Sequence, residues 1–322
     1  MAASDKVGAA PTPTPNLAPA PHPAIPGAGR AALLTLLAML AFAANSILCR
    51  LALTQTDIDP AGFTLVRIVS GAASLWLIAR ATGHAKAGAG SWRGAAALLA
   101  YAAAFSFAYL TMTAGTGALL LFGAVQATMI LVGLYRGEKL VPLQWGGLAL
   151  ALGGLALLLA PGLSTPDPLG ALLMMAAGAA WGVYSLLGRT SRDPIATTAG
   201  NFLRAAPMAA VLALLAALAG PLSGGPLFGA PMGGGVRWDQ GGLVYAVLSG
   251  ALASGVGYSI WYAALPALTA ARAASVQLSV PVITALAAVL ALGERITPVL
   301  ALSSVAVLGG IALVIVGRAR RA

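Results

Sequence analysis

Apolar residues occur in runs of about 20 along most of the chain, separated by short polar stretches. An α-helix of about 20 residues is roughly 30 Å long, which matches the hydrocarbon thickness of a bilayer. The pattern therefore predicts a series of helices that each cross a membrane once. The expected spans are residues 31–53, 60–81, 92–111, 114–135, 142–161, 168–188, 194–219, 242–264, 269–292 and 297–317.

The composition agrees with this interpretation. Hydrophobic residues make up 59% of the chain and charged residues only 8%, which is too little charge to cover a soluble surface. We therefore expect an all-α polytopic membrane protein with ten transmembrane helices. Residues 1–29 are rich in Pro and Ala and lack an apolar pattern, so they are expected to form a disordered cytoplasmic tail.

The positions of the basic residues predict the orientation in the membrane. With the N-terminus in the cytoplasm, the outer connections contain only Arg237 and Arg295, and most other basic residues fall on the cytoplasmic side. Residues 318–322 then form a basic cytoplasmic tail. The formal net charge of +10 is spread over helix ends rather than gathered in one patch, so a nucleic-acid partner is not expected.

Two similar turns reveal an internal repeat. Gly137-Glu138 and Gly293-Glu294 each follow an apolar run, and they lie 156 residues apart. Each glycine is expected to end its helix in a left-handed conformation, and each glutamate to lie near the N-terminus of the helix that follows. The turns therefore predict the same helix junction in two halves of the chain.

The first spans of the two halves also match, because residues 41–50 align with residues 180–189 and pair Arg50 with Arg189. The predicted repeats are residues 30–161 and 162–317, with five spans in each. Since five is odd, the second repeat enters from the opposite side of the membrane. We therefore expect two inverted repeats, an arrangement found in many transporters.

Residues 113–158 and 269–315 resemble the EamA-type branch of the drug/metabolite transporter superfamily. The second stretch carries the more specific motif, with Pro281 within a helix and "LGERIT" (292–297) at the helix end. The resemblance extends over residues 31–317. It implies a ten-helix exporter or facilitator of amino acids or other small metabolites, without fixing the substrate.

Polar and aromatic side chains within the predicted spans are candidates for a binding site, because polar groups are costly in hydrocarbon. Trp181, Tyr184 and Ser185 share one helix face, and Asn45 and Ser46 occupy the equivalent face in the first half. Packing between helices is the alternative role for each residue. The candidate substrate-binding residues are Asn45, Ser46, Arg67, Phe105, Tyr109, Gln126, Trp181, Tyr184, Arg204, Tyr258, Trp261, Tyr262 and Gln277.

Arg67 and Arg204 are the most costly of these side chains, because no Asp or Glu lies within any predicted span. Three roles remain open for them. They could extend to the membrane interface, bind carbonyl groups at helix ends, or meet an anionic group of the substrate. Pro281 frees a backbone carbonyl within its helix, which allows a kink or a ligand contact.

Several chemistries are not expected. Cys49 is the only cysteine, and His22 and His84 lie outside the centres of the spans, so we predict neither an intrachain disulfide nor a metal site or cofactor. The chain has no P-loop, which argues against an ATP-driven pump. Facilitated or exchange transport is favoured because no titratable carboxylate or histidine lies in mid-membrane.

The sequence therefore predicts a transporter of the bacterial inner membrane, with both termini in the cytoplasm. It would export or facilitate amino acids or similar small amphipathic metabolites by alternating access. A carrier of anionic or phosphorylated metabolites that uses the intramembrane arginines is the alternative. An integral-membrane enzyme is disfavoured, as is a structural or sensory protein. The expected partners are a small-molecule substrate and the lipid bilayer, and a homodimer is left open.

Overall fold

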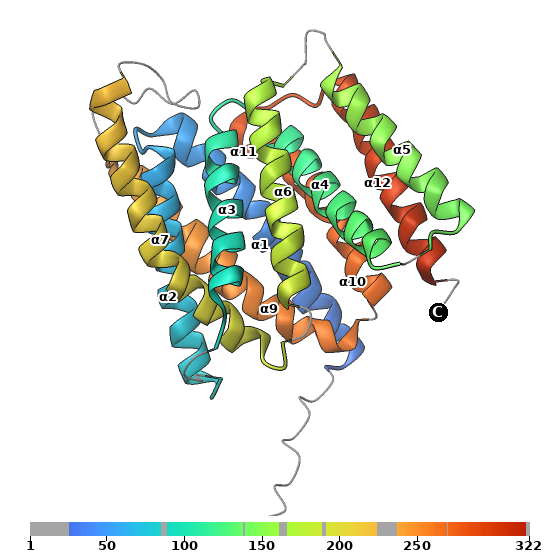
Figure 1. The fold of residues 1–322 in the computed structure, drawn as a ribbon, viewed down its shortest axis with the longest axis horizontal. Coiled ribbons are helices and arrows are strands. Elements are labelled where there is room, and N and C mark those ends of the chain that lie inside the picture. Colours follow the sequence, from blue (N-terminus) through green and yellow to red (C-terminus); the bar gives the residue numbers. More distant parts are fainter. Residues whose placement is uncertain are drawn as a thin grey trace, which may run out of the picture.

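The structure is a computed structural model that describes residues 26–84, 89–137, 139–160, 166–188, 191–223, 237–268 and 270–319. Over these residues the chain is built of helices without strands (Figure 1). The elements are α1 (Ala28–Gln55), α2 (Pro60–Ala81), α3 (Trp92–Ala108), α4 (Ala114–Tyr135), α5 (Pro142–Leu159), α6 (Pro168–Gly188), α7 (Pro194–Ser223), α8 (Gln240–Val247), the π-helix η1 (Leu248–Val256), α9 (Gly257–Ala264), the short 3-10 helix η2 (Leu265–Ala267), α10 (Ala270–Gln277), α11 (Ser279–Leu292) and α12 (Pro298–Ala319).

Nine helical segments in the described part of the chain are long and apolar enough to cross a membrane. The exception among the ten predicted spans is 92–111, where the structure has α3 with 17 residues. At 1.5 Å per residue, α3 is about 26 Å long, slightly less than the hydrocarbon thickness of a typical bilayer. The expectation of an all-α, multi-pass membrane protein is confirmed.

Helix boundaries follow local sequence signals. The Asp59 carboxylate accepts hydrogen bonds from the backbone N–H groups of Ala61 and Gly62, and Pro60 occupies the first helical position of α2. Gly293 ends α11 with a φ of 66°, the left-handed conformation that glycine adopts without steric strain. The sequence predicted this helix end at Gly293, and the structure confirms it.

Two predicted spans are interrupted. Pro281 has no N–H group to bond the carbonyl of Gln277, and α10 ends at Gln277 before α11 begins at Ser279. The segment predicted over 242–264 widens into a π-helix at η1, where the Ser254 hydroxyl donates to the Ser249 carbonyl at 2.9 Å. Such π-helical segments often occur at functional sites.

The two halves of the chain are interleaved rather than placed side by side as separate bundles. The most extensive contacts pair α5 with α12, α6 with α3 and α4, α2 with α7 and η1, and α1 with α11. Figure 1 shows the α5 and α12 pair at one edge of the molecule and α2 and α7 at the other. Each of these pairs joins a helix before residue 161 to one after it, so relative movement of the halves would change most interhelical contacts.

Small residues permit the closest of these contacts. A Cβ atom on Gly178 of α6 would lie 2.5 Å from the Leu121 carbonyl oxygen of α4. Gly182, one turn later, faces Thr128 of α4 in the same way, since its Cβ would lie 2.9 Å from the Thr128 Cβ. The Gly178 and Gly182 pair therefore brings α6 against α4, as expected for a GxxxG motif.

The outer surface is apolar, as a bilayer requires. Leu290 is 88% exposed and Val305 is 74% exposed, although both lie within helices of the predicted spans. Several sequence predictions fall outside the described residues. They concern the conformations of residues 1–25 and 320–322, and the positions of Glu138 and Arg189.

Candidate transport site

A cavity of about 1140 Å³ lies between the helices. Its wall combines aromatic and neutral polar side chains from α1, α3, α4, α6, α7, α9 and α10 with residues of η1, α5 and α12. This volume exceeds the range of ordinary small-molecule pockets, and the mixture of apolar surface with a few polar groups is typical of such sites.

Aromatic rings form the central part of the wall. The Trp181 ring stacks on Tyr184 and Tyr258, with centroid distances of 5.3 and 5.4 Å and interplanar angles of 29° and 24°. Tyr101 of α3 lies 4.9 Å from the Trp181 ring, and Phe42 of α1 lies 5.7 Å from Tyr258. These five rings come from four different helices, so the central wall of the cavity depends on the packing of both halves.

A chain of hydrogen bonds supports one side of this wall. The Ser249 hydroxyl donates to Asn45 Oδ1 at 2.6 Å, and Asn45 Nδ2 donates to the Tyr101 hydroxyl oxygen at 3.1 Å. All three side chains are buried, and both Asn45 and Tyr101 line the cavity. The chain connects η1, α1 and α3, and it fixes the position of the Tyr101 hydroxyl.

A second polar group lies between α6, α7 and α9. The hydroxyls of Thr198 and Tyr262 are 3.1 Å apart, and Asn201 Nδ2 donates to the Tyr184 hydroxyl at 3.5 Å. All four side chains line the cavity. Asn201 Oδ1 also accepts a hydrogen bond from the Ser91 N–H at 2.8 Å, so the start of α3 helps to position this group.

One end of the cavity reaches the loops between helices. Its lining includes Lys139 and Leu140 before α5, Ser191 before α7, and Leu265 after α9. These loops belong to the side of the molecule where the basic residues are concentrated in the sequence. The cavity therefore extends from the aromatic centre toward the face that we predicted to be cytoplasmic.

Charged and backbone groups meet beyond the opposite end of the cavity. Arg50 Nε lies 3.7 Å from Glu294 Oε1, and Arg50 Nη1 donates to the Tyr109 and Leu110 carbonyls at 2.7 and 3.2 Å. Both oxygens of Glu294 accept the Ala114 N–H at 2.9 Å. The contacts join α1, the α3–α4 connection and the α11–α12 connection.

The position of Glu294 corrects one prediction. We expected its carboxylate near the N-terminus of the helix that follows it, which is α12, but it caps the N-terminus of α4. The reason is the extended connection from Glu294 to Thr297, which places Thr297 next to α12. The Thr297 hydroxyl accepts the Leu300 N–H at 3.1 Å and takes the capping role instead.

The cavity brings together ten of the 13 predicted site residues. They are Asn45, Ser46, Phe105, Gln126, Trp181, Tyr184, Tyr258, Trp261, Tyr262 and Gln277. Arg67, Tyr109 and Arg204 are not among the lining residues. Tyr109 is fully buried and its ring lies 4.7 Å from Phe105, which connects the cavity wall to the carbonyl that Arg50 binds.

The two intramembrane arginines have different surroundings. Arg204 Nη1 donates to the carbonyl of Ala89 in the connection before α3 and to that of Gly200 within α7, at 2.5 and 2.9 Å, so it binds backbone carbonyls but not those of helix ends. Arg67 is 2% exposed, and its guanidinium carbon lies 5.5 Å from the Tyr101 ring centroid and 5.0 Å from the Phe105 ring centroid.

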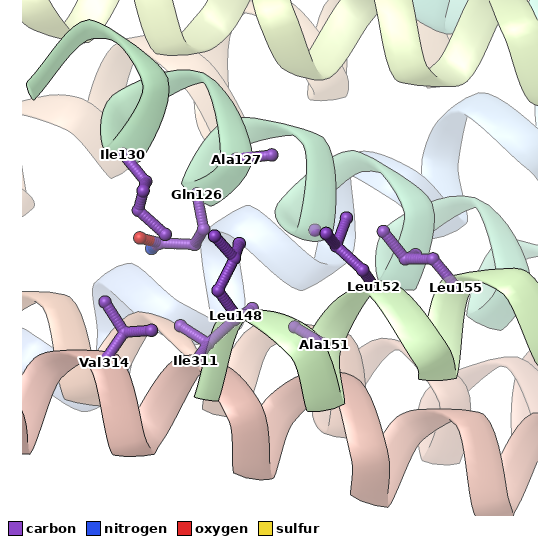
Figure 2. A pocket seen from close by; sticks show the side chains of 10 residues that line it. Gln126, Ala127, Ile130, Leu148, Ala151, Leu152, Leu155, Ile311 and Val314 are labelled. Carbon is purple, nitrogen blue, oxygen red and sulfur yellow. The ribbon is translucent and has the colours of Figure 1, made fainter. Parts of the chain in front are cut away.

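Gln126 also faces a second, much smaller space. Figure 2 shows its side chain extending from α4 toward Leu148 of α5 and toward Ile311 and Val314 of α12. This space has a volume of about 10 Å³, which is close to the minimum for one water molecule. Gln126 therefore lies where the main cavity meets the packing of α4 against the α5 and α12 pair.

Sequence reasoning missed Tyr101, Thr198 and Asn201. A signal for Tyr101 was present, because it precedes Phe105 by four residues and shares its helix face. Thr198 and Asn201 are small polar residues near the start of α7, where hydrogen bonds to the backbone are an equally good explanation of such side chains. No group of three or more His, Cys, Asp or Glu side chains is gathered in the described part of the chain.

Comparison with known proteins extends these observations. Residues 168–316 match the EamA-like transporter family. An uncharacterized protein of Pseudomonas aeruginosa is 54% identical over 294 residues, which cover 91% of this chain and 97% of the relative. A protein of known crystal structure is similar in fold, with a TM-score of 0.62 and 19% sequence identity. The match includes 91% of this chain and 99% of the other chain, and at this identity it supports the fold alone. The chain belongs to the EamA-like transporter family, within the drug/metabolite transporter superfamily.

Proposed function

We propose that the protein exports or facilitates amino acids or similar small amphipathic metabolites across the bacterial inner membrane. The observation that carries the proposal is the cavity of about 1140 Å³, with aromatic rings at its centre and neutral hydrogen-bonding groups beside them. Aromatic faces suit an apolar or planar body, and the hydroxyl and amide groups suit polar substituents. An amphipathic solute matches both.

We further propose that α3 is a tenth span and that residues 30–161 and 162–317 are inverted repeats. Two observations support the inverted repeats: the sequence match at an offset of 156 residues, and the pairing of helices from opposite halves. Both termini then lie in the cytoplasm. In this orientation the cavity extends to the cytoplasmic loops, while Arg50 and Glu294 join the helices on the outer side.

The arrangement supports alternating access as the mechanism. In the proposed orientation, solute would reach the cavity from the cytoplasm in this conformation. Passage to the outside requires separation of Arg50 from Glu294 and closure at the loops that carry Lys139 and Ser191. None of the described acidic residues lines the cavity, so we favour facilitated or exchange transport over proton coupling.

The direct test is counterflow in proteoliposomes. Vesicles that contain the purified protein are loaded with one unlabelled solute at a time, from a panel of amino acids and related metabolites, and uptake of the same labelled solute is measured. At least one solute should accumulate transiently above the level in protein-free vesicles. Absence of counterflow for the whole panel would overturn the proposal.

A pair of variants links the flux to the cavity. Ala274 lines the cavity, so Ala274→Trp should narrow it and reduce counterflow at least about tenfold. Val305 is 74% exposed on α12, and Val305→Trp should leave counterflow within about twofold of the unaltered protein. If both variants lost counterflow equally, or if neither lost it, transport through this cavity would be contradicted.

A further inference from the structure

We propose that Tyr101 and Arg67 form a subsite for a carboxylate group of the transported solute. The Tyr101 hydroxyl would donate a hydrogen bond to the carboxylate, and the Arg67 guanidinium would attract its negative charge from behind the aromatic wall. This inference rests on the proposed transport function and adds to it the chemical class of one end of the solute.

The hydrogen bonds around Tyr101 leave its proton for a ligand. The Tyr101 oxygen accepts from Asn45 Nδ2 at 3.1 Å, and the orientation of the Asn45 amide is fixed by Ser249, which donates to Oδ1 at 2.6 Å. A phenol hydroxyl that accepts one hydrogen bond can still donate one. No described residue accepts that proton, and because Tyr101 lines the cavity, a solute oxygen can do so.

Arg67 provides a positive charge that forms no ion pair with any acidic side chain in the described part of the protein. Its side chain is 2% exposed and lies over the rings of Tyr101 and Phe105, both of which line the cavity. Its Nη1 atom has no hydrogen-bond partner among the described residues. An uncompensated charge at this depth is costly, and an anion at the neighbouring wall would lower that cost.

Arg204 shows how an intramembrane arginine is accommodated without a ligand. Its Nη1 atom donates to two backbone carbonyls, those of Ala89 and Gly200. Arg67 makes cation–π contacts instead, and its buried Nη1 atom is left without a hydrogen-bond partner among the described residues. The difference points to Arg67, rather than Arg204, as the arginine that responds to a solute.

The chemistry of the subsite favours a carboxylate over a phosphate group. Phosphate sites usually combine several donors, such as forked arginines and backbone N–H groups at a helix N-terminus. Here one hydroxyl and one cation act beside the apolar faces of Trp181 and Tyr258. A single carboxylate attached to an apolar or aromatic body fits this arrangement.

Two probes of equal shape test the inference. Binding of 3-phenylpropionate and 3-phenylpropanamide to the full-length detergent-solubilised protein is measured by calorimetry at neutral pH. The carboxylate should bind at least about tenfold more tightly than the amide, as expected for one charge-assisted hydrogen bond. Equal binding of the two probes, or binding of neither, would overturn the subsite.

Conservative variants then assign the preference to the two residues. Tyr101→Phe keeps the ring and should lower the carboxylate preference to about threefold or less, because the amide loses only a neutral hydrogen bond while the carboxylate loses a stronger, charge-assisted one. Arg67→Gln should also lower the carboxylate preference to about threefold or less. Arg80 lies over the Trp76 ring at the end of α2, away from the cavity lining, so Arg80→Gln removes a charge elsewhere and should keep the full preference. An unchanged preference in folded Tyr101→Phe protein would contradict the proposal.

The two proposals can fail separately. A protein that transports only solutes without a carboxylate would overturn the subsite and leave the transport function standing. A protein that shows the Tyr101-dependent preference for 3-phenylpropionate, but no counterflow with any solute of the panel, would retain the subsite and overturn the transport function.

Discussion

Arg50 Nε lies 3.7 Å from Glu294 Oε1, and this contact joins α1 of the first half to the connection before α12 in the second. Both side chains are mostly buried, and Glu294 also holds the Ala114 N–H at the start of α4. One carboxylate therefore holds together α1, the α3–α4 connection and the α11–α12 connection on the proposed outer side. In an alternating-access cycle, these contacts must break before solute can leave outward.

Glu294→Gln should therefore favour the outward-open state. A charge-assisted contact of this kind contributes roughly 1–2 kcal/mol, so we expect at least about a fivefold increase in outward access to the cavity. The measurement uses Ser46→Cys, which places a thiol on the cavity wall, in a Cys49→Ala background. Cells are treated with a membrane-impermeant thiol reagent, and the labelling rate of Cys at this site is compared with and without Glu294→Gln.

Asp239→Asn is the matched control for this experiment, because it removes a carboxylate that caps α8 on the same proposed side. It should leave the labelling rate unchanged. If Glu294→Gln and Asp239→Asn have the same effect on labelling, the Arg50 and Glu294 pair does not close the outer side.

Trp181 is expected to dominate the binding of aromatic solutes, since its ring stacks on those of Tyr184 and Tyr258. Trp181→Ala should weaken 3-phenylpropionate about tenfold, because it removes both ring contacts and a large apolar surface. The ratio of carboxylate to amide affinity should be retained, since the Tyr101 hydroxyl is unaffected. Calorimetry with both probes measures both quantities.

Trp145→Ala provides the comparison for Trp181, since Trp145 is 54% exposed on α5 and does not line the cavity. This variant should bind both probes as the unaltered protein does. A Trp181→Ala protein with full affinity would show that the stacked rings serve packing rather than binding.

The close contact between α4 and α6 should make the stability of the protein sensitive to the size of residue 178. Gly178→Ala would place a Cβ atom 2.5 Å from the Leu121 carbonyl oxygen, so the helices must separate. The expected cost is about 1–3 kcal/mol and a lower unfolding temperature. At Gly153 of α5 no atom lies within 4 Å of an added Cβ, and Gly153→Ala should keep or raise the unfolding temperature. Thermal unfolding in detergent compares the variants, and equal unfolding temperatures would contradict the packing argument.

The helices themselves were largely predictable from the sequence, for local reasons. The Asp59-Pro60 pair marks the start of α2, Gly293 marks the end of α11, and Pro281 explains the break after Gln277. Each signal acts through backbone geometry or hydrogen bonds within about one helical turn. The widened turn of η1 carries no comparable signal, and the sequence predicted an uninterrupted helix there.

The faces that the helices bury were harder to predict. In a helix of a soluble protein, the polar residues mark the side that faces solvent. Lipid is as apolar as a protein core, so in a membrane helix the residue pattern does not separate the lipid-facing side from the buried side. Leu119 is fully buried and Leu290 is 88% exposed, although both are leucines within long apolar runs. For Tyr101 the only sequence signal was its spacing of four residues from Phe105, and the contact from Glu294 to Ala114 joins residues too far apart in the sequence for a local pattern to predict it.

Transport by this protein should not depend on a proton gradient. No described acidic residue lines the cavity, and His84, which pairs with Asp193 at 3.0 Å, lies outside the helices between α2 and α3. A proton carrier normally needs a titratable group within the pathway. Counterflow in proteoliposomes should therefore change by less than about twofold when a protonophore is added or when the internal and external pH are made unequal. The protein-free vesicles measure leak under each condition, and a flux that requires the pH gradient would replace facilitated or exchange transport with proton coupling.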